Sequence, residues 1–205
     1  MTFQTLYFDE PQYLNAEILL RAYSSGFFPM YNSMYRTLEW HCPDPRAIFP
    51  LDALKFSKSL LKTYKKNTFT YKTDENFNAV IRACAKRPQC WISPEFIQAY
   101  NDLHKLGFAH SVEVYDNDEL IGGLYGVCLG GGFFGESMFS KKSDASKCAF
   151  VFLTEILSRN NCILLDSQYI NPHTQSLGAV EIPHIDYIQL LNLALSMPQC
   201  FAKIP

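Results

Sequence analysis

Hydrophobic residues first recur at helical spacing near the start of the chain. This pattern covers residues 12–25 and stops at Gly26, so it predicts a helix there. A stretch rich in proline and aromatic residues follows, from residue 27 to residue 50. Proline fixes the backbone and removes a hydrogen-bond donor, so we expect this stretch to be stiff but irregular. Together these segments predict a small N-terminal domain over residues 1–50.

Strand and helix patterns alternate through residues 51–205, the predicted second domain. Strand-like runs occupy residues 69–72, 109–115, 120–129, 133–140, 162–168 and 180–182. Helical patterns occupy residues 52–66, 74–86, 93–106, 143–159, 173–177 and 185–195, and Asp74 is expected to cap the second of these. Three strands in succession, then a long helix and a further strand, predict an α+β fold with a mixed sheet. This order of elements is similar to that of the N-acetyltransferase (GNAT-like) superfold.

The composition excludes several classes of protein. The chain has 205 residues, of which 48% are hydrophobic and 19% charged, so it is not a disordered protein. The net charge of −2 argues against an extensive nucleic-acid coat, although it leaves room for one local basic patch.

The cysteine and histidine residues do not indicate a metal site. Seven cysteines occur without any C-x-x-C spacing, and His110 and His173 are isolated. Disulfide frameworks and zinc sites need closely spaced ligands, so we expect reduced thiols in a cytoplasmic protein. No apolar stretch approaches the roughly 20 residues that span a bilayer, and no membrane association is expected.

The sequence also lacks the motifs of nucleotide binding and covalent catalysis. Seven of the ten glycines lie between Gly122 and Gly135, yet neither G-x-x-x-x-G-K-[ST] nor G-x-G-x-x-G is present. We therefore expect neither ATP nor a dinucleotide. A Ser140–His173–Asp166 set can be assembled, but no G-x-S-x-G nucleophile elbow supports it.

Carboxylate and amide side chains interrupt two otherwise apolar strands. Glu136 lies inside one of them, and Asp166 and Gln168 end another. Positions two apart on a strand point to the same face, so the last two side chains are expected next to each other. Buried polar groups need partners, which makes this pair a candidate site. The alternative is that both only cap neighbouring backbone.

Long ordered motifs make the chain similar to one known family. They are AYSSGFFPM, WHCPDPRAIFP, AHSVE, GGLYG, GESMFS, ASK, D-x-Q and H-x-x-SLGA. In this order they resemble the leucyl/phenylalanyl-tRNA–protein transferases, from about Leu20 to Leu191. The resemblance implies an acetyltransferase-like domain without coenzyme A or another cofactor. It also implies transfer of leucine or phenylalanine, and less readily methionine, from aminoacyl-tRNA to a protein's N-terminal Arg or Lys, which marks that protein for degradation.

The same resemblance assigns roles to individual residues. Asp166 and Gln168 match the catalytic pair. Trp40 and Trp91 match aromatic residues that hold the terminal adenosine of the tRNA. The pocket for the aminoacyl side chain corresponds to Leu124, Phe133, Gly135, Glu136 and Leu165.

The chemistry of such a transfer needs positioning more than a strong base. An aminoacyl ester is already activated, and the attacking α-amine has a pKa near 8. One hypothesis is that the carbonyl of Gln168 accepts a hydrogen bond or proton from this amine while Asp166 orients Gln168. A second is that Asp166 or Glu136 contacts the cationic acceptor residue.

The helix predicted at residues 52–66 carries five lysines and one acid, Asp52. A run of lysines is often only a solvated face. On a chain that is otherwise net acidic, we favour contact with tRNA phosphates. The candidate contacts are Lys58, Lys62, Lys65 and Lys66.

Two other functions remain possible from the sequence. An acyl-CoA-dependent N-acyltransferase of the same fold would need a Q/R-x-x-G-x-G/A turn before the long helix, where Ser140-Lys141-Lys142-Ser143 stands instead. A non-catalytic module that binds charged tRNA would not require Asp166 together with Gln168. A monomer is expected, because no heptad pattern is visible.

Overall fold

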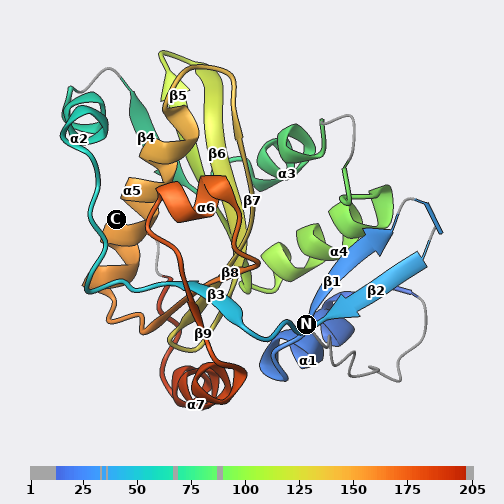
Figure 1. The fold of residues 1–205 in the computed structure, drawn as a ribbon. Coiled ribbons are helices and arrows are strands. Elements are labelled where there is room, and N and C mark those ends of the chain that lie inside the picture. Colours follow the sequence, from blue (N-terminus) through green and yellow to red (C-terminus); the bar gives the residue numbers. More distant parts are fainter. Residues whose placement is uncertain (1–12, 33, 36, 67–68, 87–89, 202–205) are drawn as a thin grey trace.

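A seven-stranded sheet in the order β4-β5-β6-β7-β8-β3-β9 forms the centre of the molecule (Figure 1). The computed structural model describes residues 13–32, 34–35, 37–66, 69–86 and 90–201, so the first twelve residues of the predicted N-terminal domain lie outside it. The strands of this sheet are β4 (Thr70–Thr73), β5 (Ala109–Asp116), β6 (Glu119–Leu129), β7 (Gly132–Ser140), β8 (Leu164–Gln168), β3 (Arg46–Phe49) and β9 (Val180–Ile182).

The strand directions confirm a mixed α+β sheet. Strands β4 to β7 pair antiparallel, β7 and β8 pair parallel, and β3 lies antiparallel between β8 and β9. Helix α5 (Ala145–Arg159) makes the crossover between the two parallel strands. The predicted run of three strands, a long helix and a further strand is therefore correct.

Helices cover both faces of this sheet, as the alternation along β6 requires. Tyr125 and Val127 belong to a core cluster shared with α1 (Ala16–Ser24), α3 (Phe77–Ala85), α4 (Pro94–Lys105) and α7 (His184–Leu195). Leu124 and Cys128 point the other way, into a cluster with α5. The two remaining helices are α2 (Lys58–Lys65) and α6 (Pro172–Ser176).

The expectation of an irregular segment over residues 27–50 is wrong. It contains β1 (Phe28–Asn32), which pairs with β2 (Thr37–His41) in a separate two-stranded ribbon, and then β3. Both strands of such a ribbon are edges, so Pro29 is tolerated inside β1. Because β3 joins the large sheet, residues 46–49 pack with the second unit. The domain boundary at residue 50 stays a prediction.

Two predicted helix starts also need correction. Helix α2 begins at Lys58 with Ser57 as its N-cap, six residues later than expected. Helix α3 is capped by Asn76 rather than Asp74. The Asp74 carboxylate instead accepts hydrogen bonds from the backbone N–H of Ser111 and bonds to the His110 ring, which is a tertiary role that a local capping rule does not encode.

Candidate active site between two diverging strands

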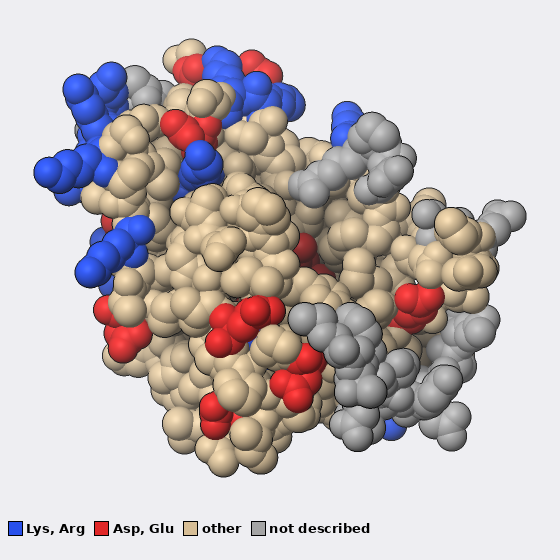
Figure 2. Space-filling model, viewed as in Figure 1, with Lys and Arg blue, Asp and Glu red and all other residues tan. Residues whose placement is uncertain are grey.

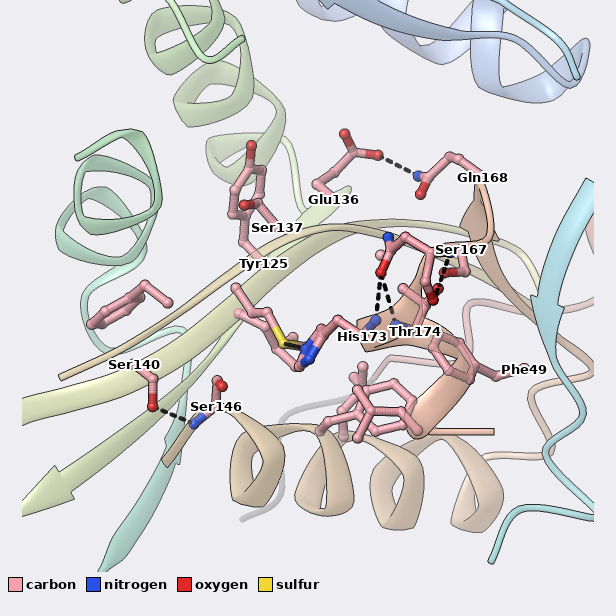
Figure 3. Close-up of a pocket in the computed structure, with 18 of the residues that line it drawn as sticks. Phe49, Tyr125, Glu136, Ser137, Ser140, Ser146, Ser167, Gln168, His173 and Thr174 are labelled. Atoms are coloured by element: carbon pink, nitrogen blue, oxygen red, sulfur yellow. Dashed lines mark hydrogen bonds between the residues drawn. The ribbon is translucent and has the colours of Figure 1, made fainter. Parts of the chain in front are cut away.

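A cavity of about 800 Å³ opens where β7 and β8 separate. These parallel strands pair only from Gly132 to Phe134 on β7 and from Leu164 to Asp166 on β8. Beyond that point Glu136 and Gln168 line the cavity from opposite strands (Figure 3). The divergence of two parallel strands thus places the polar residues singled out in the sequence on one cavity.

A β-bulge turns Glu136 toward this cavity. Tyr125 pairs with Ser137 and Gly126 pairs with Gly135, so Glu136 has no partner on β6. A Cβ atom at Gly126 would collide with the Phe134 carbonyl oxygen, which explains glycine at this position. Bulges commonly redirect a side chain next to a functional site.

The Asp166 carboxylate is buried and hydrogen-bonded on both oxygens. Arg46 Nε donates to Oδ1 at 3.0 Å and Arg46 Nη2 donates to Oδ2 at 2.7 Å. Tyr187 donates its hydroxyl to Oδ2 at 2.8 Å, and the backbone N–H of Gln168 donates to Oδ1 at 2.8 Å. A carboxylate with these partners orients its neighbours. Of the two acids proposed to contact a cationic acceptor, Glu136 is the better placed, because it is partly exposed whereas Asp166 is fully buried.

The side chain of Gln168 is held by Glu136 through its amide nitrogen. Nε2 donates to Glu136 Oε1 at 3.1 Å (Figure 3). The backbone of Gln168 has φ +60°, a left-handed conformation that side-chain-bearing residues seldom adopt. With the nitrogen fixed on Glu136, the amide oxygen has no hydrogen-bond partner among the residues that the structure describes, and it can accept a hydrogen bond.

Two tyrosines from the helices complete the surroundings of Glu136. The Tyr23 hydroxyl donates to Oε1 at 2.7 Å and the Tyr100 hydroxyl donates to Oε2 at 3.1 Å. Burial raises the pKa of Glu136 to about 7, even though these hydrogen bonds favour the charged form. Burial also raises the pKa of both tyrosines, which keeps them neutral donors. Glu136 therefore changes its charge near neutral pH.

One wall of the cavity is apolar and is formed by Phe49, Leu124, Phe150, Leu153, Leu165 and Leu177. Polar residues line other parts of the cavity, among them Ser137, Ser140, Ser146, Asn171 and Thr174. The rings of Phe49 and Phe150 pack 4.6 Å apart between their centroids. A wall of this kind accepts a hydrophobic side chain and offers it no hydrogen bonds.

Comparison with known proteins matches most of the chain to one family. Residues 48–192 match the family model described as leucyl/phenylalanyl-tRNA protein transferase, and residues 13–44 match the model of its N-terminal domain. The chain belongs to the leucyl/phenylalanyl-tRNA protein transferase family. The family predicted from the sequence motifs is confirmed.

Curated relatives with this name cover nearly the full chain. A leucyl/phenylalanyl-tRNA–protein transferase of Gloeobacter violaceus is 49% identical over 90% of this chain and 96% of its own length. Those of Chlorobaculum tepidum and Rubrobacter xylanophilus are 48% and 47% identical over 89% and 92% of the chain. Among solved structures, L-PGS from Bacillus licheniformis matches 83% of this chain and 50% of that chain at a TM-score of 0.39 and 13% identity.

The structure brings most, but not all, of the predicted pocket residues to the cavity. Leu124, Gly135, Glu136 and Leu165 line it, as do both members of the predicted catalytic pair, Asp166 and Gln168. Phe133 does not, because its ring packs in the core against Gly126 and against Phe201, with 5.6 Å between the ring centroids.

Only one of the two predicted adenosine contacts lines the cavity, and the alternative serine site does not form. Trp91 lines the cavity, whereas Trp40 lies opposite Pro29 in the two-stranded ribbon. Ser140 donates its hydroxyl to the Lys142 carbonyl rather than to a histidine, so no catalytic triad forms with Asp166.

The four predicted tRNA-contacting lysines lie at α2, away from the residues that line the cavity. All are exposed, and none has an ion-pair partner within the described segments. Figure 2 shows Lys and Arg side chains gathered over this helix.

Leu60 of α2 packs against Cys148 and Val151 of α5. Since α5 also presents Phe150 and Leu153 to the cavity, α2 is fixed to a wall of the site.

Sequence reasoning missed four residues around the acids, namely Tyr23, Arg46, Tyr100 and Tyr187. The available signal for Arg46 was its place in the motif WHCPDPRAIFP.

Among the described residues no group of His, Cys, Asp or Glu could hold a metal ion. In that part of the chain no helix is both long and apolar enough to cross a membrane.

Proposed function

We propose that this chain transfers leucine or phenylalanine, and less readily methionine, from aminoacyl-tRNA to the N-terminal Arg or Lys of an acceptor protein. Membership of the transferase family supports the reaction. The observation that carries the assignment to this site is a cavity that has one apolar wall and has Gln168 and Glu136 on its polar side. The aminoacylated acceptor would then be marked for degradation.

In this proposal the aminoacyl side chain occupies the apolar wall and the ester lies near Gln168. The α-amine of the acceptor attacks the ester carbonyl, a C–N bond forms, and the bond to the ribose oxygen breaks. The ribose oxygen leaves with a proton that the amine gives up. The Gln168 oxygen accepts a hydrogen bond from the amine, so the amide orients the nucleophile.

No cofactor is needed in this scheme, because the ester itself supplies the activation. Glu136, when ionised, attracts the cationic side chain of the acceptor. Trp91 stacks on the terminal adenine, a contact worth about 1–3 kcal/mol. Lys58, Lys62, Lys65 and Lys66 neutralise phosphates of the acceptor arm. The enzyme is proposed to act as a monomer in the cytoplasm, where charged tRNA is found.

We also propose that the second unit is GNAT-like. The support is the antiparallel run β5-β6-β7, followed by a crossover helix and a parallel β8 that separates from β7. The acyl-CoA-dependent alternative shares this architecture, so a fold assignment alone does not decide between them.

A transfer assay with three arms tests the function. The protein is mixed with leucyl-tRNA labelled in the amino acid and a peptide that begins with Arg, with or without ribonuclease, and in the third arm an acyl-CoA replaces the tRNA. We expect ribonuclease-sensitive label on the peptide α-amine. Label only from acyl-CoA contradicts the proposal, and binding of the tRNA without turnover indicates the non-catalytic module.

A further inference from the structure

Arg46 lies outside the cavity wall but is completely buried beside it. In addition to its two bonds to Asp166, its Nη1 donates to the Gly26 carbonyl at 2.9 Å. The centroids of the Phe28 and Tyr187 rings lie 4.8 and 4.4 Å from its guanidinium carbon. Burial would lower the pKa of Arg46, but the Asp166 carboxylate raises it above its usual value, so the side chain is cationic.

We propose that Arg46 is a positioning residue for the transfer reaction, acting with Tyr187 through Asp166 on Gln168. The inference rests on the proposed function and deepens it. Arg46 and Tyr187 fix the direction of the Asp166 carboxylate, and Oδ1 of that carboxylate receives the backbone N–H of Gln168. This bond holds Gln168 in its left-handed conformation, from which its amide reaches Glu136.

The geometry requires an arginine rather than a positive charge alone. The guanidinium binds both carboxylate oxygens and a backbone carbonyl at once, which one ammonium group does not do in the same plane. Lysine at this position would keep the charge but let the carboxylate rotate. The bond to the Gly26 carbonyl also ties the carboxylate to the segment that follows α1.

The test is a single-turnover transfer with enzyme in excess over labelled leucyl-tRNA, together with the Kd and the binding stoichiometry for that tRNA. We expect Arg46→Lys to lower the transfer rate of the bound complex about 100-fold. The Kd and stoichiometry stay at the wild-type values, because the apolar wall and α2 are untouched. Arg159→Lys is the matched control, since Arg159 is exposed and pairs with Glu155 at 3.5 Å away from the cavity.

A wild-type rate in the bound Arg46→Lys complex overturns the inference, even if the variant is less stable. If Arg46→Lys does not fold, Tyr187→Phe decides. It removes one hydrogen bond from Oδ2 and is expected to slow transfer about tenfold without changing the Kd. An unchanged transfer rate in Tyr187→Phe also overturns the inference. Tyr71→Phe is the control, because Tyr71 does not line the cavity and its hydroxyl bonds to the Tyr64 carbonyl, at 3.4 Å, and to the Cys148 thiol.

Failure of the inference and failure of the proposed function give different results. If the wild-type protein transfers no label from leucyl-tRNA to the peptide, the proposed function is wrong. If the wild type transfers label and both variants match it, only the positioning role of Arg46 is wrong. Rescue of Arg46→Ala by added methylguanidinium, with no effect on the wild type, would support the positioning role further.

Discussion

Arg46 and the lysines of α2 carry positive charge in two opposite settings. Arg46 is fully buried and each of its bonds goes to a group of the protein itself. The lysines of α2 are exposed and have no ion-pair partner within the described residues. The first setting completes the site from inside, while the second offers charge to a partner that the protein does not contain.

This difference teaches what a net charge of −2 can and cannot say about function. A sum over the sequence counts Arg46 and a lysine of α2 equally. Only the lysines are free to neutralise phosphates, because Arg46 is already neutralised by Asp166. The low net charge therefore limits the extent of nucleic-acid contact and is compatible with one basic helix.

Breaking the buried pair is expected to have the largest effect on stability. Arg46→Ala leaves the Asp166 carboxylate buried without its cation, which costs about 3–5 kcal/mol of unfolding free energy. The measurement is urea denaturation followed by circular dichroism. Lys62→Ala, on the exposed helix, is the control and should change stability by less than about 0.5 kcal/mol. Equal effects of the two changes would contradict the comparison.

The cost should come from the unpaired charge rather than from lost volume. Replacing both partners at once, as Arg46→Met with Asp166→Leu, is therefore expected to recover much of the lost stability. The double variant should nevertheless remain inactive, because Gln168 loses the acceptor of its backbone N–H.

Removing the Gln168 side chain is expected to affect the rate and not the fold. Gln168→Ala should lower the single-turnover rate about 100-fold, because the amine loses its hydrogen-bond acceptor. The melting temperature should change little, since the side chain lies at the cavity. Gln98→Ala, at an exposed position of α4 outside the cavity lining, serves as the control. Transfer at the full rate in Gln168→Ala would show that the amide does not orient the nucleophile.

Neutralising the lysines of α2 should act on tRNA affinity through its salt dependence. The plot of log K against log salt concentration has a negative slope. Losing four phosphate contacts should make this slope shallower by about 3. The variant changes Lys58, Lys62, Lys65 and Lys66 to alanine, and tRNA binding is measured by filter binding over a range of salt. Changing Lys72, Arg82, Lys105 and Arg159 together removes the same four charges away from α2 and is the control for net charge. A slope that falls equally in both variants would place the phosphate contacts elsewhere.

Local patterns predicted the acids of the site, but not what holds them. The spacing of Asp166 and Gln168 suggested neighbouring side chains, and they are in fact linked through the backbone N–H of Gln168. Arg46 lies 120 positions away from Asp166, and no local periodicity encodes such a pair. Because arginine is seldom fully buried, composition also gave no reason to place it inside.

The fold shows the same division between local and distant information. The three-strand run and the helix after it follow from period-two alternation and helical spacing, and both are present. The prediction of an irregular segment over residues 27–50 is wrong because proline was taken to exclude strands. In a two-stranded ribbon the outer edge of each strand has no pairing partner, so Pro29 needs no backbone N–H there. The insertion of β3 between β8 and β9 depends on tertiary pairing, which determines that Arg46 meets Asp166.

Glu136 lies between the two settings, since its charge depends on pH. Its pKa is raised to about 7, so it is mostly neutral below that pH and anionic above it. Attraction for the cationic acceptor residue therefore grows as the pH rises through 7, and the KM for a peptide beginning with Arg should fall about fivefold between pH 6 and pH 8. Glu136→Gln should abolish this fall, whereas Glu181→Gln, exposed on β9, should keep it.

The acceptor amine titrates over a neighbouring range and has to be separated from Glu136. Its pKa near 8 makes kcat rise with pH in every variant, because only the neutral amine attacks. The contribution of Glu136 belongs to the KM of the acceptor, so KM and kcat are measured separately at each pH. If Glu136→Gln keeps the wild-type dependence of KM on pH, the acceptor residue does not bind beside this carboxylate.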